Sequence, residues 1–201
     1  MLNPTLRAEL LEMRAADLRL RQELVRDGSL FDGYNERMAE LHRRQNARLA
    51  LLLAEHGWPG RALVNEDGAA AAWLLLQHAI LDPPLMRGAV PLLERAVEAH
   101  DADSRHLAFL VDRIRTMEGK PQLYGTSHDW DAAGQLSPVP IEEPAAVDER
   151  RRHVGLEPLA ENTRRLRAQA EAEGEGPPAD YEARRRESEA WARATGWRSG
   201  E

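Results

Sequence analysis

Apolar side chains recur three or four positions apart through the first 119 residues, the spacing that places them on one face of an α-helix. Residues that favour helix ends, namely Asn, Asp, Gly and Pro, interrupt this pattern at intervals. The pattern predicts five helices with these limits: residues 4–27, Asp32 to His56, Ala69 to Leu81, Asp82-Pro83 to Val97, and Asp103 or Ser104 to Gly119. The sequence therefore favours an all-α fold.

The sequence also predicts how individual helices pack and how regular they are. The first two are joined by a short loop, so we expect them to pack antiparallel. The third, Ala69–Leu81, is apolar almost all round and is the best candidate for a helix at the centre of the domain. Pro91 lies inside the fourth and has no backbone N–H, so we expect a kink there or regular hydrogen bonding only at the two ends of that helix.

The chain changes character after Gly119. Two segments, 122–126 and 135–141, have the composition of extended arms around a turn, but two prolines in the second arm prevent a regular ladder. We therefore expect an irregular strap over residues 120–141, with little or no sheet.

Residues 142–201 contain 14 acidic and 11 basic residues, and too few large apolar residues to build a core of their own. We expect short helices over about 144–152, 158–172 and 178–195, with a linker at 174–178. The predicted architecture is one bundle-like helical domain, residues 1–141 with its strap, and a charged helical extension, residues 142–201, that packs on this core and wraps it.

Composition narrows the classes of function. The net charge is −7 and aromatic residues make up 5% of the chain, which argues against nucleic-acid binding. The chain has no Cys, so thiol catalysis and Cys-based metal sites are excluded. The sequence has no leader-like start and no run of about 18 apolar residues, so we expect a soluble cytoplasmic protein that does not bind membranes.

Two polar residues on apolar helix faces are candidates for chemistry. His78 follows Gln77 in the third predicted helix, where a buried imidazole either serves as a general acid or base or is a core residue with its own hydrogen-bond partner. Asp17 lies on or beside the apolar stripe of the first helix, four residues before Arg21. These two residues either contribute to a ligand pocket or form an ordinary intrahelical ion pair.

Further polar residues border the predicted inward faces, where they can line a pocket or only flank it: Asn46, Asp112 and Arg113. Gln122, Tyr124 and Thr126 alternate along the strap, so in an extended segment they project to one side. That arrangement suits recognition of a polar small molecule, and it equally suits a loop that these groups tie down.

The positions of the His residues argue against a metal site. None of the seven forms a His-x-x-x-His or Glu-x-x-His pair, which would place two ligands on one helix face. Motifs for nucleotide binding and for a nucleophile elbow are also missing from the sequence. We therefore expect no metal and no cofactor.

Five short motifs follow one another along the chain: His56-Gly57-Trp58-Pro59, Glu66-Asp67-Gly68, Gln77-His78-Ala79, Asp112-Arg113, and Gln122-Leu123-Tyr124-Gly125-Thr126. In this order they resemble a bacterial domain family of unknown function, whose members show H-G-W-P, G-E-D-G, Q-H-A, D-R and Y-G-T-Q. Asp17 and Arg21 are similar to a D-Q-x-x-R element of that family. The resemblance implies that the polar motif residues share a pocket. The chain differs from the family pattern at four positions: Asn65, Ile80, Met86 and Ser127.

We expect a small-molecule-binding protein, and an enzyme if His78 acts as general acid or base with Tyr124 as a second catalytic residue. The substrate is expected to be polar or anionic, with Arg21 or Arg113 binding its negative charge. The other expected substrate-binding residues are Asp17, Asn46, Gln77, Asp112, Gln122 and Thr126. The alternative is a non-catalytic protein-interaction module in which these groups form a structural network, and a homodimer through residues 142–201 is a further open alternative.

Overall fold

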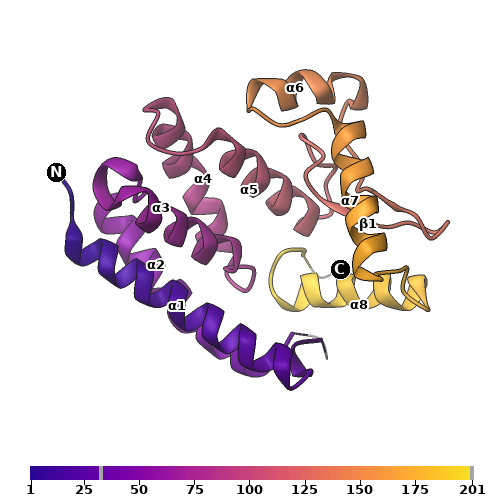
Figure 1. Cartoon of the computed structure of the whole chain (residues 1–201), viewed down its shortest axis with the longest axis horizontal. Helices are drawn as coiled ribbons and strands as arrows, with labels where there is room; N and C mark the ends of the chain where they lie inside the picture. Colours follow the sequence, from indigo (N-terminus) through magenta and orange to yellow (C-terminus); the bar gives the residue numbers. More distant parts are fainter. Residues whose placement is uncertain (32–33, 200–201) are drawn as a thin grey trace. The chain divides into compact units, whose positions relative to one another are not determined.

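The computed structural model describes residues 1–31 and 34–199, and these residues form eight α-helices (Figure 1). Within the same residues, sheet is limited to two strands of three residues each. The predicted all-α fold class, with very little sheet, is therefore confirmed.

Contacts divide the chain into two compact units, Met1–Asp103 and Ser104–Glu201. In this division the fifth helix and the strap group with the charged C-terminal helices. The predicted domains, residues 1–141 and 142–201, and the packing of the second on the first stay predictions.

The first unit contains four helices: α1 (Pro4–Arg26), α2 (Glu36–His56), α3 (Arg61–Gln77) and α4 (Pro83–Glu98). A short 3-10 turn, η1 (Ser29–Phe31), follows α1. Asn3 caps α1 by accepting a hydrogen bond from the N–H of Leu6, as its position before Pro4 predicts. Asn35 caps α2, while Asp32, the residue predicted for that role, lies outside the described residues.

Ion pairs show the relative direction of α1 and α2. Arg37 near the start of α2 pairs with Glu23 near the end of α1 at 3.0 Å, and Arg48 farther along α2 pairs with Glu9 near the start of α1. Because the partners advance in opposite directions along the two helices, α1 and α2 are antiparallel. The prediction from the short connecting loop is confirmed.

α3 differs from its predicted limits at both ends. It begins at Arg61 instead of Ala69, but Val64 and Asn65 leave the helical conformation and break it near its start. Asn65 adopts φ 58° and ψ 175°, a region that only Gly occupies without strain. The backbone at this position therefore favours Gly, and Asn65 holds it with strain.

α3 ends at Gln77, and His78 is its C-cap residue. The prediction that His78 lies in the middle of a helix reaching Leu81 is therefore wrong. The physical reason is the next helix start: Asp82 precedes Pro83, adopts φ −131° and caps α4 through the N–H of Leu85. The chain needs the preceding residues for the turn into that cap. α4 itself runs through Pro91.

The second unit contains α5 (Ser104–Met117), strands β1 (His128–Trp130) and β2 (Leu136–Pro138), and three C-terminal helices. A 3-10 turn, η2 (Pro144–Ala146), precedes the first of these, and the three are α6 (Val147–His153), α7 (Leu159–Glu173) and α8 (Tyr181–Ala194). Their limits agree closely with the predicted short helices. β1 and β2 pair antiparallel around the predicted turn.

The first extended arm was predicted at 122–126, and it pairs with the second arm only at its start, where Gln122 forms an isolated bridge with Ile141. The strand that pairs is His128–Trp130, and the segment 122–126 is irregular, with Gly125 at φ 66°. The cause is a buried carboxylate that draws this segment into a bend.

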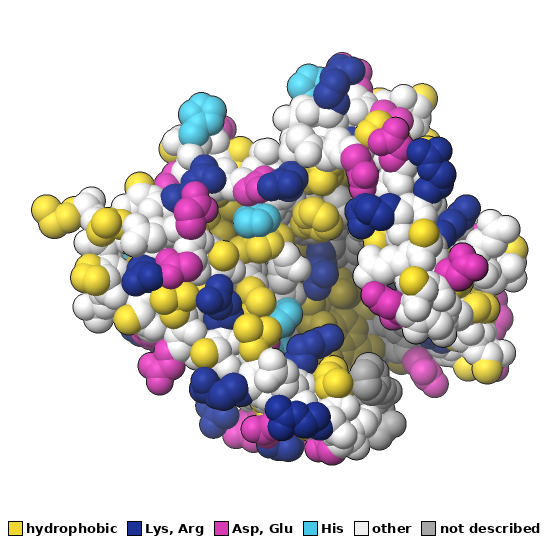
Figure 2. Space-filling view, in the orientation of Figure 1, with side chains coloured by type: hydrophobic (Ala, Val, Ile, Leu, Met, Phe, Trp, Pro, Cys, Tyr) yellow, Lys and Arg dark blue, Asp and Glu magenta, His cyan; other side chains and the backbone are white. Residues whose placement is uncertain are grey.

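Charged side chains of both signs are interspersed over the face of the molecule seen in Figure 2. None of the described helices is long and apolar enough to cross a bilayer.

Candidate functional site

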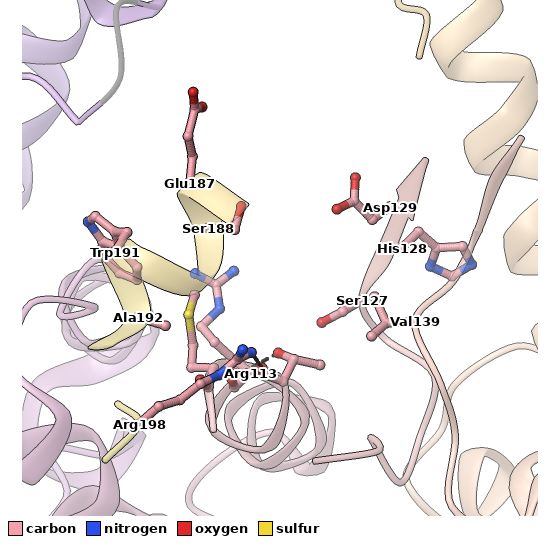
Figure 3. A pocket seen from close by; sticks show the side chains of 12 residues that line it. Arg113, Ser127, His128, Asp129, Val139, Glu187, Ser188, Trp191, Ala192 and Arg198 are labelled. Carbon is pink, nitrogen blue, oxygen red and sulfur yellow. Dashed lines mark hydrogen bonds between the residues drawn. The ribbon is translucent and has the colours of Figure 1, made fainter. Parts of the chain in front are cut away.

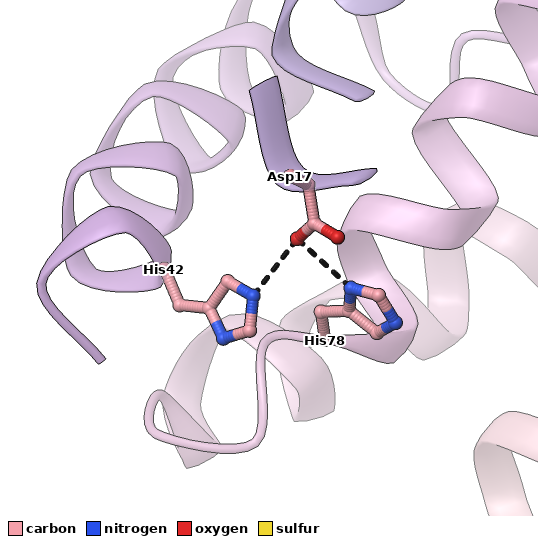
Figure 4. Close-up of side chains that lie close together, drawn as sticks. All are labelled: Asp17, His42 and His78. Carbon is pink, nitrogen blue, oxygen red and sulfur yellow. Dashed lines mark hydrogen bonds and ion pairs between the residues drawn. The ribbon is translucent and has the colours of Figure 1, made fainter. Parts of the chain in front are cut away.

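Asp17 lies on the buried stripe of α1, between Leu10 and Leu24, and its side chain is 0% exposed. Its Oδ2 atom accepts hydrogen bonds from Nε2 of His42 at 2.8 Å and from Nδ1 of His78 at 2.9 Å (Figure 4). Arg21, one turn farther along α1, is exposed. In the described structure the carboxylate therefore pairs with two imidazoles instead of with Arg21. We call Asp17, His42 and His78 the His–Asp cluster.

The cluster brings together side chains from three helices. His42 lies on the buried face of α2, and its Nδ1 atom forms a hydrogen bond with the hydroxyl of Tyr34. His78 caps the end of α3, and 30% of its side chain is exposed. The cluster therefore has a rigid buried part, Asp17 and His42, and one residue that reaches solvent.

Opposing effects set the charge of Asp17. Burial alone raises the pKa of its carboxyl group, because it disfavours the charged form. The hydrogen bonds from His42 and His78 outweigh burial and hold the pKa well below the usual range of a carboxyl group. The carboxylate is therefore ionised at neutral pH. Its other oxygen, Oδ1, is buried without a hydrogen-bond partner among the described residues.

The hydrogen bonds also indicate where the ring protons lie. Burial, together with the charge of Asp17, raises the pKa of Tyr34 to about 12, so its hydroxyl keeps its proton and can donate to Nδ1 of His42. His42 then donates from Nε2 to Asp17, and His78 donates from Nδ1. Nε2 of His78 is left as an acceptor, and Figure 4 shows it directed away from the carboxylate.

This arrangement permits two kinds of chemistry. A carboxylate that orients an imidazole, with the other ring nitrogen available, is the geometry of a general acid or base. The same ligand atoms lie within 4.8 Å of one another, so the cluster could also hold a metal ion. Spacing along the chain reveals ligands that share one helix, whereas the ligands of this cluster come from three. The sequence did contain one signal, an Asp on an apolar stripe, but no spacing of residues singled out His42.

Two other candidates of the first unit lie in different surroundings. Asn46 is buried on α2, and its Nδ2 atom has no hydrogen-bond partner among the described residues. Gln77 is half-buried at the end of α3. Their roles in substrate binding stay predictions.

In the second unit, a single carboxylate gathers the irregular part of the strap. Asp112 on α5 is fully buried and accepts hydrogen bonds from the backbone N–H groups of Leu123, Tyr124 and Thr126 at 2.6–3.1 Å. It also accepts one from the hydroxyl of Thr126 at 2.9 Å. In this structure Asp112 and Thr126 fix the course of the strap. Gly125 lies inside the bend with φ 66°, where a side chain would be strained.

Gln122 fixes the next part of the strap. Its side chain is fully buried, donates to the carbonyls of Ser127 and Val139 and accepts from the N–H of Ser127. Because Ser127 belongs to the first arm and Val139 to the second, one amide holds both arms together. The side chains of Gln122 and Thr126 therefore bond to different partners, and the projection of Gln122, Tyr124 and Thr126 to one side stays a prediction.

Two arginines of α6 support the bend from the other side. Arg151 is buried and donates to the carbonyls of Tyr124 and Gly125 at 2.7 and 3.2 Å. Arg150 donates to the carbonyl of Leu123 at 2.7 Å. The strap is thus held by a carboxylate that accepts from its N–H groups and by guanidinium groups that donate to its carbonyls.

A cavity of about 590 Å³ lies beside the strap, with residues of α5, β1 and α8 in its walls (Figure 3). Arg113 and Arg198 lie at its floor, and Ser127, His128 and Asp129 form one wall. The lining is completed by Thr116, Met117, Val139, Glu187, Ser188, Trp191 and Ala192. We call this cavity the Arg pocket.

The two arginines are fixed differently. Arg198 donates from Nε to the carbonyl of Met117 at 3.0 Å and from its terminal nitrogen to that of Thr116 at 3.3 Å. Arg113 follows Asp112 directly on α5, and its burial lowers the pKa of its guanidinium. A cation that is partly removed from water interacts strongly with an anion placed next to it.

A family model described as a family of unknown function, DUF6624, matches residues 4–173 of the chain. The chain belongs to this family. No curated protein and no solved structure matches it. The DUF6624 region contains the His–Asp cluster, Asp112, Gln122 and the strap, whereas α8 and Arg198 lie beyond the matched residues.

The residues predicted as one site therefore form two groups within the DUF6624 region. His78 and Asp17 meet in the first unit, and Asp112, Gln122 and Thr126 hold the strap in the second. Arg113 is the one of these candidates that lines the Arg pocket, and Tyr124 is not among the described residues that do. A single hollow shared by His78 and Tyr124 stays a prediction, as does a catalytic role for either.

Proposed function

We propose that this member of DUF6624 is a small-molecule-binding protein whose ligand is a polar, anionic compound bound in the Arg pocket. The observation that carries the proposal is the placement of two guanidinium groups, those of Arg113 and Arg198, at the floor of one cavity. A guanidinium group presents paired N–H donors that match the two oxygens of a carboxylate or phosphate.

The other walls fit a small molecule with more than one kind of group. The volume of about 590 Å³ is in the range of ligand pockets. Trp191, Met117 and Val139 offer apolar surface, while Ser127 and Ser188 offer hydroxyls. Asp129 on the wall already pairs with Arg184 at 2.8 Å, so the two guanidinium groups of the floor are the better site for a negative charge.

The residues that hold the strap acquire a role in this proposal. Gln122 fixes both the N–H and the carbonyl of Ser127, and Asp112 fixes the segment that leads to it. Ser127 and the two residues after it form the wall opposite α8. Asp112, Gln122 and Thr126 therefore act as positioning residues, and Arg113 as the residue that touches the ligand.

The test uses the full chain and two dianions, inorganic phosphate and succinate, in a thermal-shift titration. A ligand that binds only the folded protein raises the melting temperature in proportion to the logarithm of its concentration. We expect this rise in the wild type and in Arg186→Gln, which removes an exposed arginine of α8 outside the pocket. We expect Arg113→Gln to lose it.

An equal rise in Arg113→Gln and in the wild type would contradict the proposal. If neither dianion stabilises any of the three proteins, the non-catalytic interaction module becomes the better account, with the polar groups serving the strap alone. A cytoplasmic location is part of the proposal and is not needed for this test.

A further inference from the structure

We propose that the His–Asp cluster binds a divalent transition-metal ion through the carboxylate of Asp17, Nε2 of His42 and Nδ1 of His78. The proposal goes beyond the Arg pocket and does not depend on it, because all three ligands belong to the first unit. It replaces the expectation, based on spacing along single helices, that the chain has no metal site.

The distances within the cluster suit a metal. Zinc and iron bind imidazole nitrogen and carboxylate oxygen at about 2.0–2.2 Å, so neighbouring ligand atoms in such a site lie about 3.0–3.4 Å apart. Oδ2 of Asp17 already lies 2.8 Å from the nitrogen of His42 and 2.9 Å from that of His78. The ligand atoms all lie within 4.8 Å of one another, so the three side chains are grouped closely enough to share one ion.

The charge of the cluster calls for a cation. Asp17 is fully buried, and its Oδ1 atom has no hydrogen-bond partner among the described residues. A buried carboxylate is stable only when a positive charge or a full set of donors compensates the lost hydration. Among the described residues, its polar partners are two imidazoles, and Arg21 points to solvent. A divalent ion would compensate the charge and engage the carboxylate.

Tyr34 is placed to orient one ligand. Metal-bound imidazoles usually donate their second ring N–H to a neighbouring acceptor, which fixes the ring and its tautomer. When Nε2 of His42 binds the metal, its proton moves to Nδ1, and the hydroxyl of Tyr34 becomes the acceptor of that hydrogen bond. The ring proton of His78 moves in the same way from Nδ1 to Nε2, which reaches solvent.

The donor set indicates the class of metal. Two imidazoles and one carboxylate are typical of zinc and of non-haem iron(II), whereas magnesium and calcium prefer oxygen ligands alone. Three protein ligands leave coordination positions for water or a substrate. His78 is 30% exposed at the end of α3, so one of the three ligands is accessible to solvent.

The experiment titrates Co²⁺, which reports its ligands through its visible absorption, into the EDTA-treated full chain, and repeats the titration with Zn²⁺ by calorimetry. We expect one ion per chain in the wild type. Asp17→Asn, His42→Gln and His78→Gln should each lower the affinity by more than the ~10–100-fold that loss of an outer partner costs. Tyr34→Phe should lie within that smaller range, and His56→Gln, which removes the other His of α2, should bind like the wild type.

Folding of each variant is checked by circular dichroism. The wild type gives a second readout that needs no variant: Zn²⁺ should shift the ¹⁵N resonances of the His42 and His78 rings and leave that of His56 in place. The proposal is overturned if the wild type binds neither ion, if the cluster variants bind as well as it does, or if Zn²⁺ moves other His rings only. Absence of binding would assign the cluster to Asp17 orienting His78 as an acid or base.

Discussion

The strap offers the sharpest test of how this fold is held, because one side chain accepts hydrogen bonds from three of its backbone N–H groups. Asp112→Ala removes the acceptor of three N–H groups and one hydroxyl at once. No neighbouring group can replace it without moving the bend, since α6 presents only donors, Arg150 and Arg151, to the same segment.

The expected loss of stability follows from these bonds. A buried N–H left without an acceptor costs about 1–3 kcal/mol, so three of them set a range of about 3–9 kcal/mol. Water that enters the space of the missing carboxylate compensates part of this, so we expect a loss of about 3–5 kcal/mol. Asp112→Asn should cost less than Asp112→Ala but should still destabilise, because its oxygen keeps part of these donors while its amide nitrogen faces the others.

Urea unfolding of the full chain, followed by circular dichroism, measures this loss. The control is Asp180→Ala at the exposed start of α8. It removes a carboxylate that accepts a hydrogen bond from one N–H group, that of Ala183, and it should lower the free energy of unfolding by about 1 kcal/mol. The reasoning is refuted if Asp112→Ala and Asp180→Ala unfold at the same urea concentration, or if Asp112→Asn is as stable as the wild type.

Three further predictions use the same assay. Gly125→Ala should destabilise the fold more than Gly155→Ala. Both glycines have positive φ, but only the alanine methyl group at position 125 would meet a neighbour, Leu159, at 2.7 Å. Equal losses of stability would contradict this prediction. Asn65→Gly should stabilise the folded protein by about 1 kcal/mol, because it relieves backbone strain. Asn46→Gly, inside α2, should destabilise it. A loss of stability in both variants would show that position 65 is unstrained. Burial, followed by the charge of Arg151, lowers the pKa of His128, so the unfolded chain binds this proton more readily. Stability should therefore fall as the pH drops below about 6.5, and His128→Gln should weaken that dependence; an unchanged pH profile would refute the assignment.

Much of the fold could be predicted from the sequence because local signals and burial agree in most helices. The start of α1 at Asn3-Pro4, the end of α2 at Gly57 and the start of α4 at Asp82-Pro83 all carry residues that fix the backbone locally. α3 did not follow its apolar pattern. Its first turn precedes a break at Asn65, and the residues predicted for its end form the turn into α4. Neither feature changes the spacing of apolar residues, so the hydrophobic pattern could not predict them.

The candidate site was predictable only in part, for a related reason. Asp17 was visible as a charge on an apolar stripe, and His78 as an imidazole in an apolar segment. His42 gave no such signal, because its role depends on which face of α2 meets α1. The first arm of the strap was misplaced because Asp112 bends it, and hydrogen bonds donated by backbone N–H groups leave no mark on the alternation of side chains.

The way in which Asp112 holds the strap has an evolutionary consequence. A carboxylate that binds main-chain amides recognises the course of the backbone and is indifferent to most of the side chains attached to it. Mutations at the three positions that follow Thr126 can therefore alter what the neighbouring cavity accepts while the loop keeps its path. The lining of the cavity can thus change by the exchange of a few residues, without a new scaffold.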